Sequence, residues 1–413
     1  MAAAFPIRSQ GALSGIRVVE LAGQLGEWCG KLLAGMGADL IKVEPPGGSS
    51  TRDIGPFVAD QAHPDRSLYF WQNNAGKRAV TLDLQQEQGM ALLRRLIDGA
   101  DLFLETLAPG EAEASGLDYE TLAATNRRLI VCSITPFGPD GPYADLETTD
   151  LVSMALGGPM QSCGYDAEDG DLPPVRPGQY HSFHTAGHFA CTGILAALYE
   201  RELSGLGQHV EVAAHDCLAV TVEFANTHWY YAQQVLRRKT GRHAGVMPSA
   251  RSQHLCADGH YVNLGIPFGA GWQMLLDLLD EYGLAGELEG LDLSDVATRF
   301  ANAGRIYDVL QVLCAMHSAD EIFHMGQRLG FTWGAVRAPE DWLGDPQADS
   351  RGFFVELEHP ELGRSYTYPG APFIAHDSPW QIRRRAPLVG EDNDAVYAEL
   401  GLSPPDRADR LQS

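Results

Sequence analysis

The sequence is poor in positive charge. Of its 413 residues, 30 are Lys or Arg and 54 are Asp or Glu, which gives a formal net charge of -24. Such a chain repels a phosphate backbone, so nucleic acid is not expected as a partner, and an anionic ligand needs a local positive pocket. The seven cysteines occur singly and without a CxxC pair, which argues against a zinc knuckle or a disulfide framework.

Long apolar runs are also missing. No segment reaches the length of a membrane span, and the first residues lack the basic and apolar parts of a signal peptide. We therefore expect a cytoplasmic protein with no membrane partner. The hydrophobic fraction of 45% is that of a globular chain, and 413 residues exceed what one compact core holds, so we expect two domains.

Two ligand-binding motifs are absent. The loop 23–31 follows a predicted strand and opens a helix, as anion-binding turns do, but it does not match GxGxxG. HExxH is missing too, and no metal is expected.

The densest positive charge lies at 236–243 (LRRKTGRH) and at 383–385 (RRR). Each cluster has two interpretations, a solvated face or a phosphate clamp.

Short apolar runs alternate with amphipathic segments in the first half of the chain. Strands separated by helices require crossover connections, so this pattern predicts an α/β fold with a largely parallel, helix-covered sheet. The predicted strands lie at 16–21, 38–44, 79–84, 101–106, 129–135 and 209–213. Further on, the pattern predicts helices over 185–208 and 214–236, a hairpin over 250–265 and a second, smaller domain.

Three histidines, His181, His184 and His188, stand within eight positions of a small, apolar stretch. Their spacing would align them on one helix face, but Ser182 is a plausible N-cap, which would leave His181 outside the helix. Packed and hydrogen-bonded imidazoles, a base or nucleophile, and a metal site are the three interpretations of this group.

Several segments, read in order, resemble the family III CoA-transferases, which include formyl-CoA:oxalate and carnitine CoA-transferases and the α-methylacyl-CoA racemases. The matching phrases are LSGIRVVELAGQ, GMGADLIKVEPPGG, FWQNNAGKRAVTLDL, ADLFLETLAPGEAEASGLDYETLAATNRRLI, SITPFGPDGPYAD, GILAALYERELSGLGQHVEVAAHD, GAVRAPEDWLGDP and APLVGED. The resemblance implies a Rossmann-like large domain over 1–225, a smaller α+β domain over 226–350, a segment 351–413 that returns to the large domain, and an interlinked homodimer.

The resemblance also implies the ligands, an acyl-CoA thioester and a small carboxylic acid, with coenzyme A entering as part of the substrate. The residues expected to line the CoA groove are Gln24, Arg52, Lys77, Arg78, Thr106, Leu107 and Phe183.

The catalytic positions depart from the family pattern. The transferases attack the thioester with an aspartate ten residues before the glycine of GILAAL, and that position holds Phe183 here. The racemases add a histidine where Thr149 stands, so both halves of their acid/base pair are absent.

Three interpretations follow. The chemistry has moved to His184, assisted by His181 or Asp150, which would give an unusual transferase, a hydrolase, a lyase or an isomerase. Alternatively, a true transferase takes its carboxylate from Asp166, Glu168, Asp169 or Asp171, or the chain is a non-catalytic acyl-CoA-binding paralogue or subunit. CoA transfer is the nominal activity, with His184, His181 and Asp150 as the candidate catalytic residues.

Overall fold

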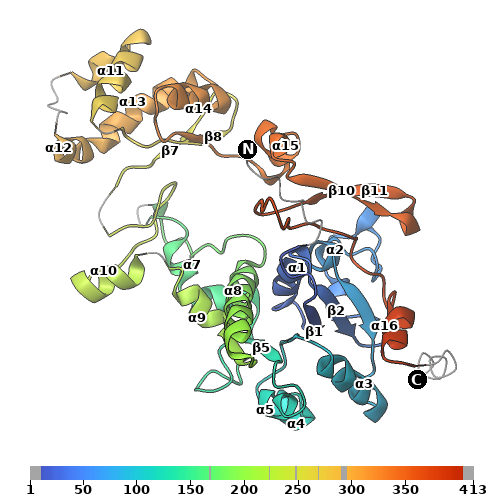
Figure 1. Cartoon of the computed structure of the whole chain (residues 1–413). Coiled ribbons are helices and arrows are strands. Elements are labelled where there is room, and N and C mark those ends of the chain that lie inside the picture. The colour runs from blue at the N-terminus through green and yellow to red at the C-terminus, as the bar shows by residue number, and fades with distance from the viewer. Residues whose placement is uncertain are drawn as a thin grey trace, which may run out of the picture. The chain divides into compact units, whose positions relative to one another are not determined.

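The computed structural model describes residues 11–166, 169–222, 224–246, 249–267, 269–289 and 295–402. The chain divides into two compact units (Figure 1). The large unit comprises Met1–Gly157, Gly178–Thr221 and Pro346–Ser413, and the small unit comprises Gly158–Pro177 and Val222–Asp345. The domain limits expected from the sequence stay a prediction.

A six-stranded parallel sheet forms the centre of the large unit, as predicted. Its strands follow the order β3-β2-β1-β4-β5-β6, and every neighbouring pair is parallel. This is the doubly wound order, which reverses between β1 and β4. The strands are β1 (Arg17–Leu21), β2 (Asp39–Glu44), β3 (Arg78–Thr81), β4 (Leu102–Glu105), β5 (Ile130–Thr135) and β6 (His209–Ala213).

Both faces of the sheet are covered by helices, which is why its strands are near-continuous apolar runs. Neighbouring residues of β1 belong to different cores. Val18 packs with residues of α1 (Glu27–Gly35) and α8 (His181–Ser204), whereas Val19 packs with those of α3 (Glu87–Asp98) and α16 (Asn393–Glu399). The other helices of the unit are α2 (Leu68–Asn74), α4 (Glu111–Ser115), α5 (Tyr119–Ala123), α6 (Asp150–Leu156), α9 (Ala214–Ala219) and α15 (Pro346–Ser350).

The C-terminal part of the chain packs on the large unit. It forms the antiparallel hairpin of β10 (Phe354–His359) and β11 (Arg364–Pro369) and then α16, which lies beside β3 (Figure 1). The Tyr397 hydroxyl donates to the main-chain oxygen of Thr81 over 2.8 Å, and the indole of Trp380 donates to that of Leu32 over 3.1 Å. Two segments distant in sequence therefore share one core.

The small unit has its own core, built mainly from amphipathic helices. A three-stranded antiparallel sheet of β7 (Gln253–Leu255), β8 (Tyr261–Asn263) and β9 (Gly334–Ala335) packs with them, and β7 and β8 confirm the predicted hairpin. The helices are α7 (Pro159–Ser162), α10 (Ala225–Ala232), α11 (Ala270–Glu281), α12 (Val296–Ala301), α13 (Ala303–Ala315) and α14 (Ala319–Arg328).

The single helix predicted over 214–236 is wrong. α9 ends at Ala219 and α10 begins at Ala225. Between them stand Val220, Thr221 and Val222, whose β-branched side chains disfavour a helix. α8, by contrast, runs through 24 residues to Gly205, whose φ of 78° is the left-handed conformation that commonly ends a helix. No helix among the described residues combines the length and the apolar character that crossing a bilayer requires.

Candidate functional site

A cavity of about 430 Å³ lies in the large unit where the strand order reverses. Its walls include loops that follow three neighbouring strands, β1, β4 and β5. In doubly wound sheets, ligands bind beyond the carboxyl ends of the strands at this reversal. The cavity is lined by Gln24, Leu25, the segment 106–109, Pro136, the segment 144–148 and Phe183.

Four residues that the sequence assigned to CoA binding meet at this cavity: Gln24, Thr106, Leu107 and Phe183. The main-chain N–H of Gly23 donates to the Thr106 hydroxyl oxygen over 3.0 Å, which ties the loop after β1 to the loop after β4. The Gln24 side chain forms a hydrogen bond with Tyr69 of α2. The position of these four residues therefore depends on strand ends and on local hydrogen bonds.

Phe183 reaches the cavity wall from the first turn of α8. Asp150 holds this turn, because one oxygen of its buried carboxylate accepts from the Ser182 N–H over 2.9 Å and from the Ser182 hydroxyl over 2.6 Å. A carboxylate at a helix start satisfies an unpaired N–H and opposes the helix dipole. The prediction that Ser182 is the N-cap is wrong: Tyr180 is the N-cap, and Ser182 is buried inside the first turn.

All three histidines lie inside α8, and none of them lines the cavity. The His184 ring packs against Trp28 of α1, with ring centroids 4.7 Å apart. The Trp28 indole donates to Nε2 of His188 over 3.4 Å, and Nδ1 of His188 lies 2.8 Å from the main-chain oxygen of His184. His181 is exposed. His184 is therefore a half-buried ring packed on Trp28, whereas His188 is an exposed, hydrogen-bonded imidazole.

His184 is a weaker base than an ordinary imidazole, and its catalytic role stays a prediction. Burial lowers its pKa to about 4, and the neighbouring His181 and His188 act in the same direction, while Asp150 opposes them. An ordinary imidazole has a pKa near 6.5, so His184 is neutral near pH 7. Among the described residues, no group of three His, Cys, Asp or Glu side chains is placed to hold a metal ion.

Arg52 sits in an internal ion-pair network and is 1% exposed. Its Nε and Nη2 atoms donate to the two carboxylate oxygens of Glu44 over 2.8 and 3.0 Å, and Nη1 donates to Asp65 over 3.0 Å. The guanidinium carbon also lies 3.7 Å from the ring centroid of Phe70. Binding of a CoA phosphate by Arg52 stays a prediction, and it would require these contacts to break.

Lys77 and Arg78 are also engaged within the large unit. The fully buried Lys77 ammonium donates to the Glu20 carboxylate over 2.8 Å and to the Asn74 side chain over 2.9 Å. Arg78 pairs with Glu399 of α16 over 2.5 Å. Neither residue lines the cavity beside Phe183, so their assignment to the CoA groove stays a prediction.

Sequence reasoning missed two carboxylates of the cavity, Asp145 and Glu147. They belong to the loop between β5 and α6, which has no periodicity and whose proximity to Phe183 arises only in the fold. The acidic loop considered from the sequence includes Asp166 and Asp169, which belong to the small unit. Asp166 accepts from Arg242 over 2.7 Å, and Asp169 pairs with Arg251.

The other two members of that acidic loop also stay predictions as sources of the carboxylate. Asp171 belongs to the small unit, and Glu168 lies outside the described residues.

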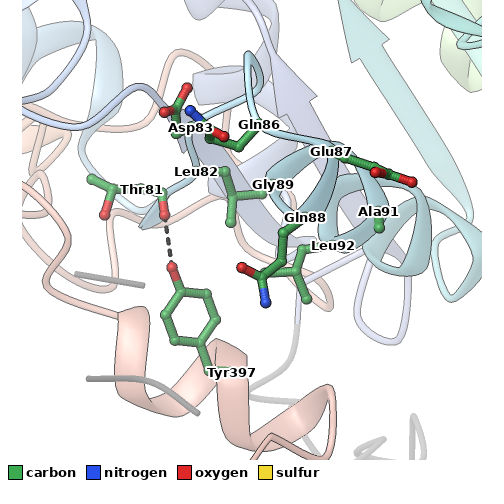
Figure 2. A pocket seen from close by; sticks show the side chains of 10 residues that line it. All are labelled: Thr81, Leu82, Asp83, Gln86, Glu87, Gln88, Gly89, Ala91, Leu92 and Tyr397. Atoms are coloured by element: carbon green, nitrogen blue, oxygen red, sulfur yellow. Dashed lines mark hydrogen bonds between the residues drawn. The ribbon is translucent and has the colours of Figure 1, made fainter. Parts of the chain in front are cut away.

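A cavity of about 590 Å³ lies beside the sheet edge, between the end of β3 and the start of α3 (Figure 2). Figure 2 shows Tyr397 closing one side through its hydrogen bond to Thr81. The remaining walls carry carboxylates and amides, among them Asp83, Gln86 and Glu87. None of the residues predicted for the site lines this cavity, and it lies at the edge strand and not at the strand-order reversal.

Comparisons with known proteins identify the family of this chain. The family model described as CoA-transferase family III matches residues 13–393. The chain is 34% identical over 399 residues to the succinyl-CoA:(R)-benzylsuccinate CoA-transferase subunit BbsE of Thauera aromatica, covering 94% of each chain. It is 31% identical over 392 residues to the succinate–glutarate CoA-transferase of Agrobacterium fabrum, covering 94% of this chain and 95% of the relative.

Among solved structures, a CAIB/BAIF family protein from Brucella suis superposes with a TM-score of 0.82 at 29% identity, covering 95% of this chain and 100% of that one. The resemblance read from the sequence is thereby confirmed, together with the α/β fold class and a CoA-transferase-like activity. The chain belongs to CoA-transferase family III.

Proposed function

We propose that this chain transfers coenzyme A between an acyl-CoA thioester and a small carboxylic acid at the cavity beside Phe183. The observation that carries the proposal is that Gln24, Thr106, Leu107 and Phe183 line one cavity at the strand-order reversal. Its volume of about 430 Å³ is within the range of small-molecule sites.

The reaction needs a nucleophile that Phe183 cannot supply, because a phenyl ring has no lone pair to attack an acyl carbon. Glu147 and Asp145 are the carboxylates of the same cavity. A carboxylate oxygen would attack the thioester carbonyl, the C–S bond would break, and CoA would leave as the thiolate, giving a mixed anhydride. Attack of that thiolate on the protein carbonyl would release the donor acid and leave CoA on the side chain. The acceptor acid would then attack the protein thioester to form a second mixed anhydride, and the released thiolate would attack its acyl carbon to give the new acyl-CoA and the free side chain.

Of the two carboxylates, Glu147 is nearer in the chain to the residues that hold the start of α8. The residues that follow it are fixed: Thr148 bonds the Ser153 hydroxyl over 2.7 Å, Thr149 caps α6, and Asp150 holds the start of α8 beside Phe183. Asp145 instead lies within a turn closed by a main-chain bond from Leu146 to Tyr143. We therefore assign the nucleophile to Glu147 and treat Asp145 as its matched control.

The test is incubation of the purified full chain with succinyl-CoA and several carboxylic acids, glutarate and benzylsuccinate among them, followed by mass analysis of the thioesters. Exchange of CoA between acids supports the transfer, whereas free CoA plus acid indicates hydrolysis. Glu147→Gln should reduce exchange by at least about a hundredfold, and Asp145→Asn should retain it. If exchange survives Glu147→Gln, Glu147 is not the nucleophile, but the proposed CoA transfer still stands.

His184, His181 and Asp150 stay proposed as assisting residues. The support is chemical: His184 is neutral near pH 7 and follows Phe183 in the chain. If His184 acts as a base toward water or a Cα proton, the products would be those of a hydrolase, a lyase or an isomerase. His184→Ala separates these cases, since turnover unchanged by the substitution excludes His184 from the mechanism.

A second candidate is that the chain is one subunit of a heteromeric CoA-transferase. Two observations favour it: Phe183 stands where the family nucleophile is expected, and the Thauera aromatica relative is itself named as a subunit. The outer face of α8 also exposes apolar side chains, with Tyr199 72% and Leu203 74% exposed. Co-expression with a family III chain that carries the aspartate is the test. Exchange only in the mixture, unaffected by Glu147→Gln, would favour this candidate over a homodimer that acts alone.

A further inference from the structure

A third cavity of the large unit, of about 270 Å³, lies against β5 and β6. Strand residues two apart point to the same face of a sheet, so Val131, Ser133 and Thr135 of β5 share the face that lines the cavity. His209 and Glu211 of β6 share that face in the same way. The proposed transfer reaction uses none of these hydroxyl, imidazole and carboxylate groups.

Three side chains of this cavity stand in the order nucleophile, base and carboxylate. The Ser133 Oγ lies 2.8 Å from Nε2 of His209, and Nδ1 of the same ring lies 3.5 Å from a carboxylate oxygen of Glu211. The sheet sets this order, because Ser133 stands opposite Glu211 in the parallel pair of β5 and β6. An imidazole between a hydroxyl and a carboxylate can take the hydroxyl proton, while the carboxylate fixes the tautomer of the ring.

The His209 ring is held in place and remains accessible. The Tyr119 ring stacks on it, with centroids 6.0 Å apart and planes inclined by 12°. The Tyr119 hydroxyl donates to the main-chain oxygen of Gly207 over 2.9 Å, which fixes this ring to the chain that enters β6. The His209 side chain is still 31% exposed, so water and a small substrate can reach it.

Glu105 holds the Ser133 oxygen from the other side. This carboxyl group is 3% exposed, accepts from the Leu107 N–H over 2.5 Å and forms a hydrogen bond with Ser133. Burial raises the pKa of the Glu105 carboxyl, which favours its protonated form. A protonated Glu105 would donate to the Ser133 oxygen and leave the hydroxyl proton to His209.

Thr135 provides a donor for the charge that develops when a carbonyl is attacked. Its side chain lines the same cavity, two residues beyond Ser133 on the same face of β5. The Thr135 oxygen accepts from the Gly138 N–H over 2.9 Å, which orients the hydroxyl. A fixed hydroxyl proton beside the nucleophile can stabilise an oxyanion.

The charge of the lining selects the substrate. The lining carries the carboxyl groups of Glu105, Glu113, Asp118, Glu120 and Glu211. It holds no Lys or Arg among the described residues, so it repels anions such as carboxylic acids and the phosphates of coenzyme A. Leu117 and Val131 supply apolar surface for a short acyl chain. The volume lies just below the range of drug-sized ligands, which fits a small, uncharged molecule.

We propose that Ser133, His209 and Glu211 form an esterase site that hydrolyses short, uncharged carboxylic esters. The Ser133 oxygen attacks the ester carbonyl carbon as its proton passes to Nε2 of His209. The bond to the alcohol oxygen breaks, and the alcohol leaves with that proton, which gives an acyl-serine. Water then attacks the acyl-serine, its proton passes to His209 and from there to Ser133, and the carboxylic acid leaves.

Hydrolysis of phenyl acetate by the purified full chain, measured as release of phenol without coenzyme A, tests the proposal. Failure of this activity is therefore distinguishable from failure of CoA transfer. Ser133→Ala should reduce the protein-dependent rate at least about a hundredfold, and Thr135→Val at least about tenfold. Ser204→Ala is the matched control, because this serine of the same unit donates to Glu200 and not to an imidazole. Circular dichroism confirms that each variant is folded.

Diisopropyl fluorophosphate provides a second measurement that a structural role of Ser133 would not affect. An activated serine displaces its fluoride, so mass analysis should find one diisopropyl phosphoryl group on the peptide that contains Ser133. His209→Gln should prevent this labelling, because the amide cannot act as the base. Hydrolysis that Ser133→Ala leaves unchanged, or an absence of both hydrolysis and labelling, would overturn the proposal.

An anionic ester tests the assigned substrate class. Relative to the uncatalysed rates, phenyl acetate should be accelerated at least about tenfold more than 4-acetoxybenzoate, and added salt should narrow this difference. Equal acceleration of the two esters would contradict the selection of uncharged substrates by the carboxylates of the lining.

Discussion

Replacing Lys77 by Met distinguishes a structural lysine from a phosphate-binding one. The Lys77 ammonium lies 3.0 and 2.8 Å from the two carboxylate oxygens of Glu20, and both side chains are fully buried. Its removal leaves Glu20 with Lys42 alone, 3.1 Å from one oxygen. Breaking a buried ion pair costs about 3–5 kcal/mol, and because Lys42 remains, we expect the lower end, about 3 kcal/mol.

The measurement is urea unfolding, followed by hydrogen exchange in peptides that cover β1 and α1, so that the large unit is observed separately. Lys77→Met should shift the midpoint strongly to lower urea, and Glu20→Gln combined with Lys77→Met should recover much of the loss, because no buried charge then lacks a partner. If Lys77→Met were as stable as the wild type and bound coenzyme A more weakly, Lys77 would not be a structural lysine. Its ammonium would then bind the ligand.

Lys31 provides the matched control for this experiment. It is also buried, but burial and the nearby Lys77 lower its pKa to about 7, and no carboxylate pairs with it among the described residues. Its ammonium donates to the main-chain oxygen of Gln72 over 2.5 Å and lies 5.3 Å from the Trp28 ring centroid. Lys31→Met should therefore change the unfolding free energy by less than about 1 kcal/mol.

Three further predictions concern α8 and the edge of the sheet. The pKa of His184 is about 4 in the folded chain, so the unfolded chain binds more protons between about pH 6.5 and 4. The free energy of unfolding therefore falls as the pH drops through that window. His184→Gln should flatten this part of the profile of urea midpoint against pH, and an unchanged slope would contradict the prediction. Asp150→Ala leaves the Ser182 N–H and hydroxyl without their acceptor, which should cost about 1–2 kcal/mol and increase hydrogen exchange at the start of α8. Gly207→Ala would place a Cβ 1.8 Å from the main-chain oxygen of Leu129, so the chain before β6 must shift. The thermal unfolding midpoint should therefore fall by several degrees. A wild-type midpoint would show that the backbone here can move without loss of stability.

The strands were predictable from sequence because a sheet covered on both faces needs continuous apolar residues. β5 is apolar at Ile130 and Val131 on opposite faces, and both side chains are buried. The break between α9 and α10 was missed because apolar residues continue through it. Val220 and Phe224 are each 67% exposed, so their hydrophobicity does not mark a buried helical face.

Only part of the site was predictable from the sequence. Gln24 and Thr106 follow strands whose ends meet at the reversal, and topology alone brings them together. Whether a cation is available to a ligand depends on tertiary partners that the sequence does not reveal. Arg52 comes eight residues after Glu44 in the chain, yet only the fold sets the bidentate pair between them.

The distribution of charge divides the proposed coenzyme A thioester into two parts that bind differently. The described lining of the cavity beside Phe183 holds Asp145 and Glu147 but no Lys or Arg, so the uncharged pantetheine part suits it, whereas phosphates would be repelled. We expect the phosphates to bind outside this cavity, at positive side chains whose attraction salt can screen. It follows that rising salt should weaken the binding of acyl-CoA, because phosphate contacts are screened, and should leave a pantetheine thioester almost unaffected. Equal salt dependence of the two thioesters would mean that charge enters the cavity itself, and Arg52 or Lys77 would then have to leave its internal partners on binding.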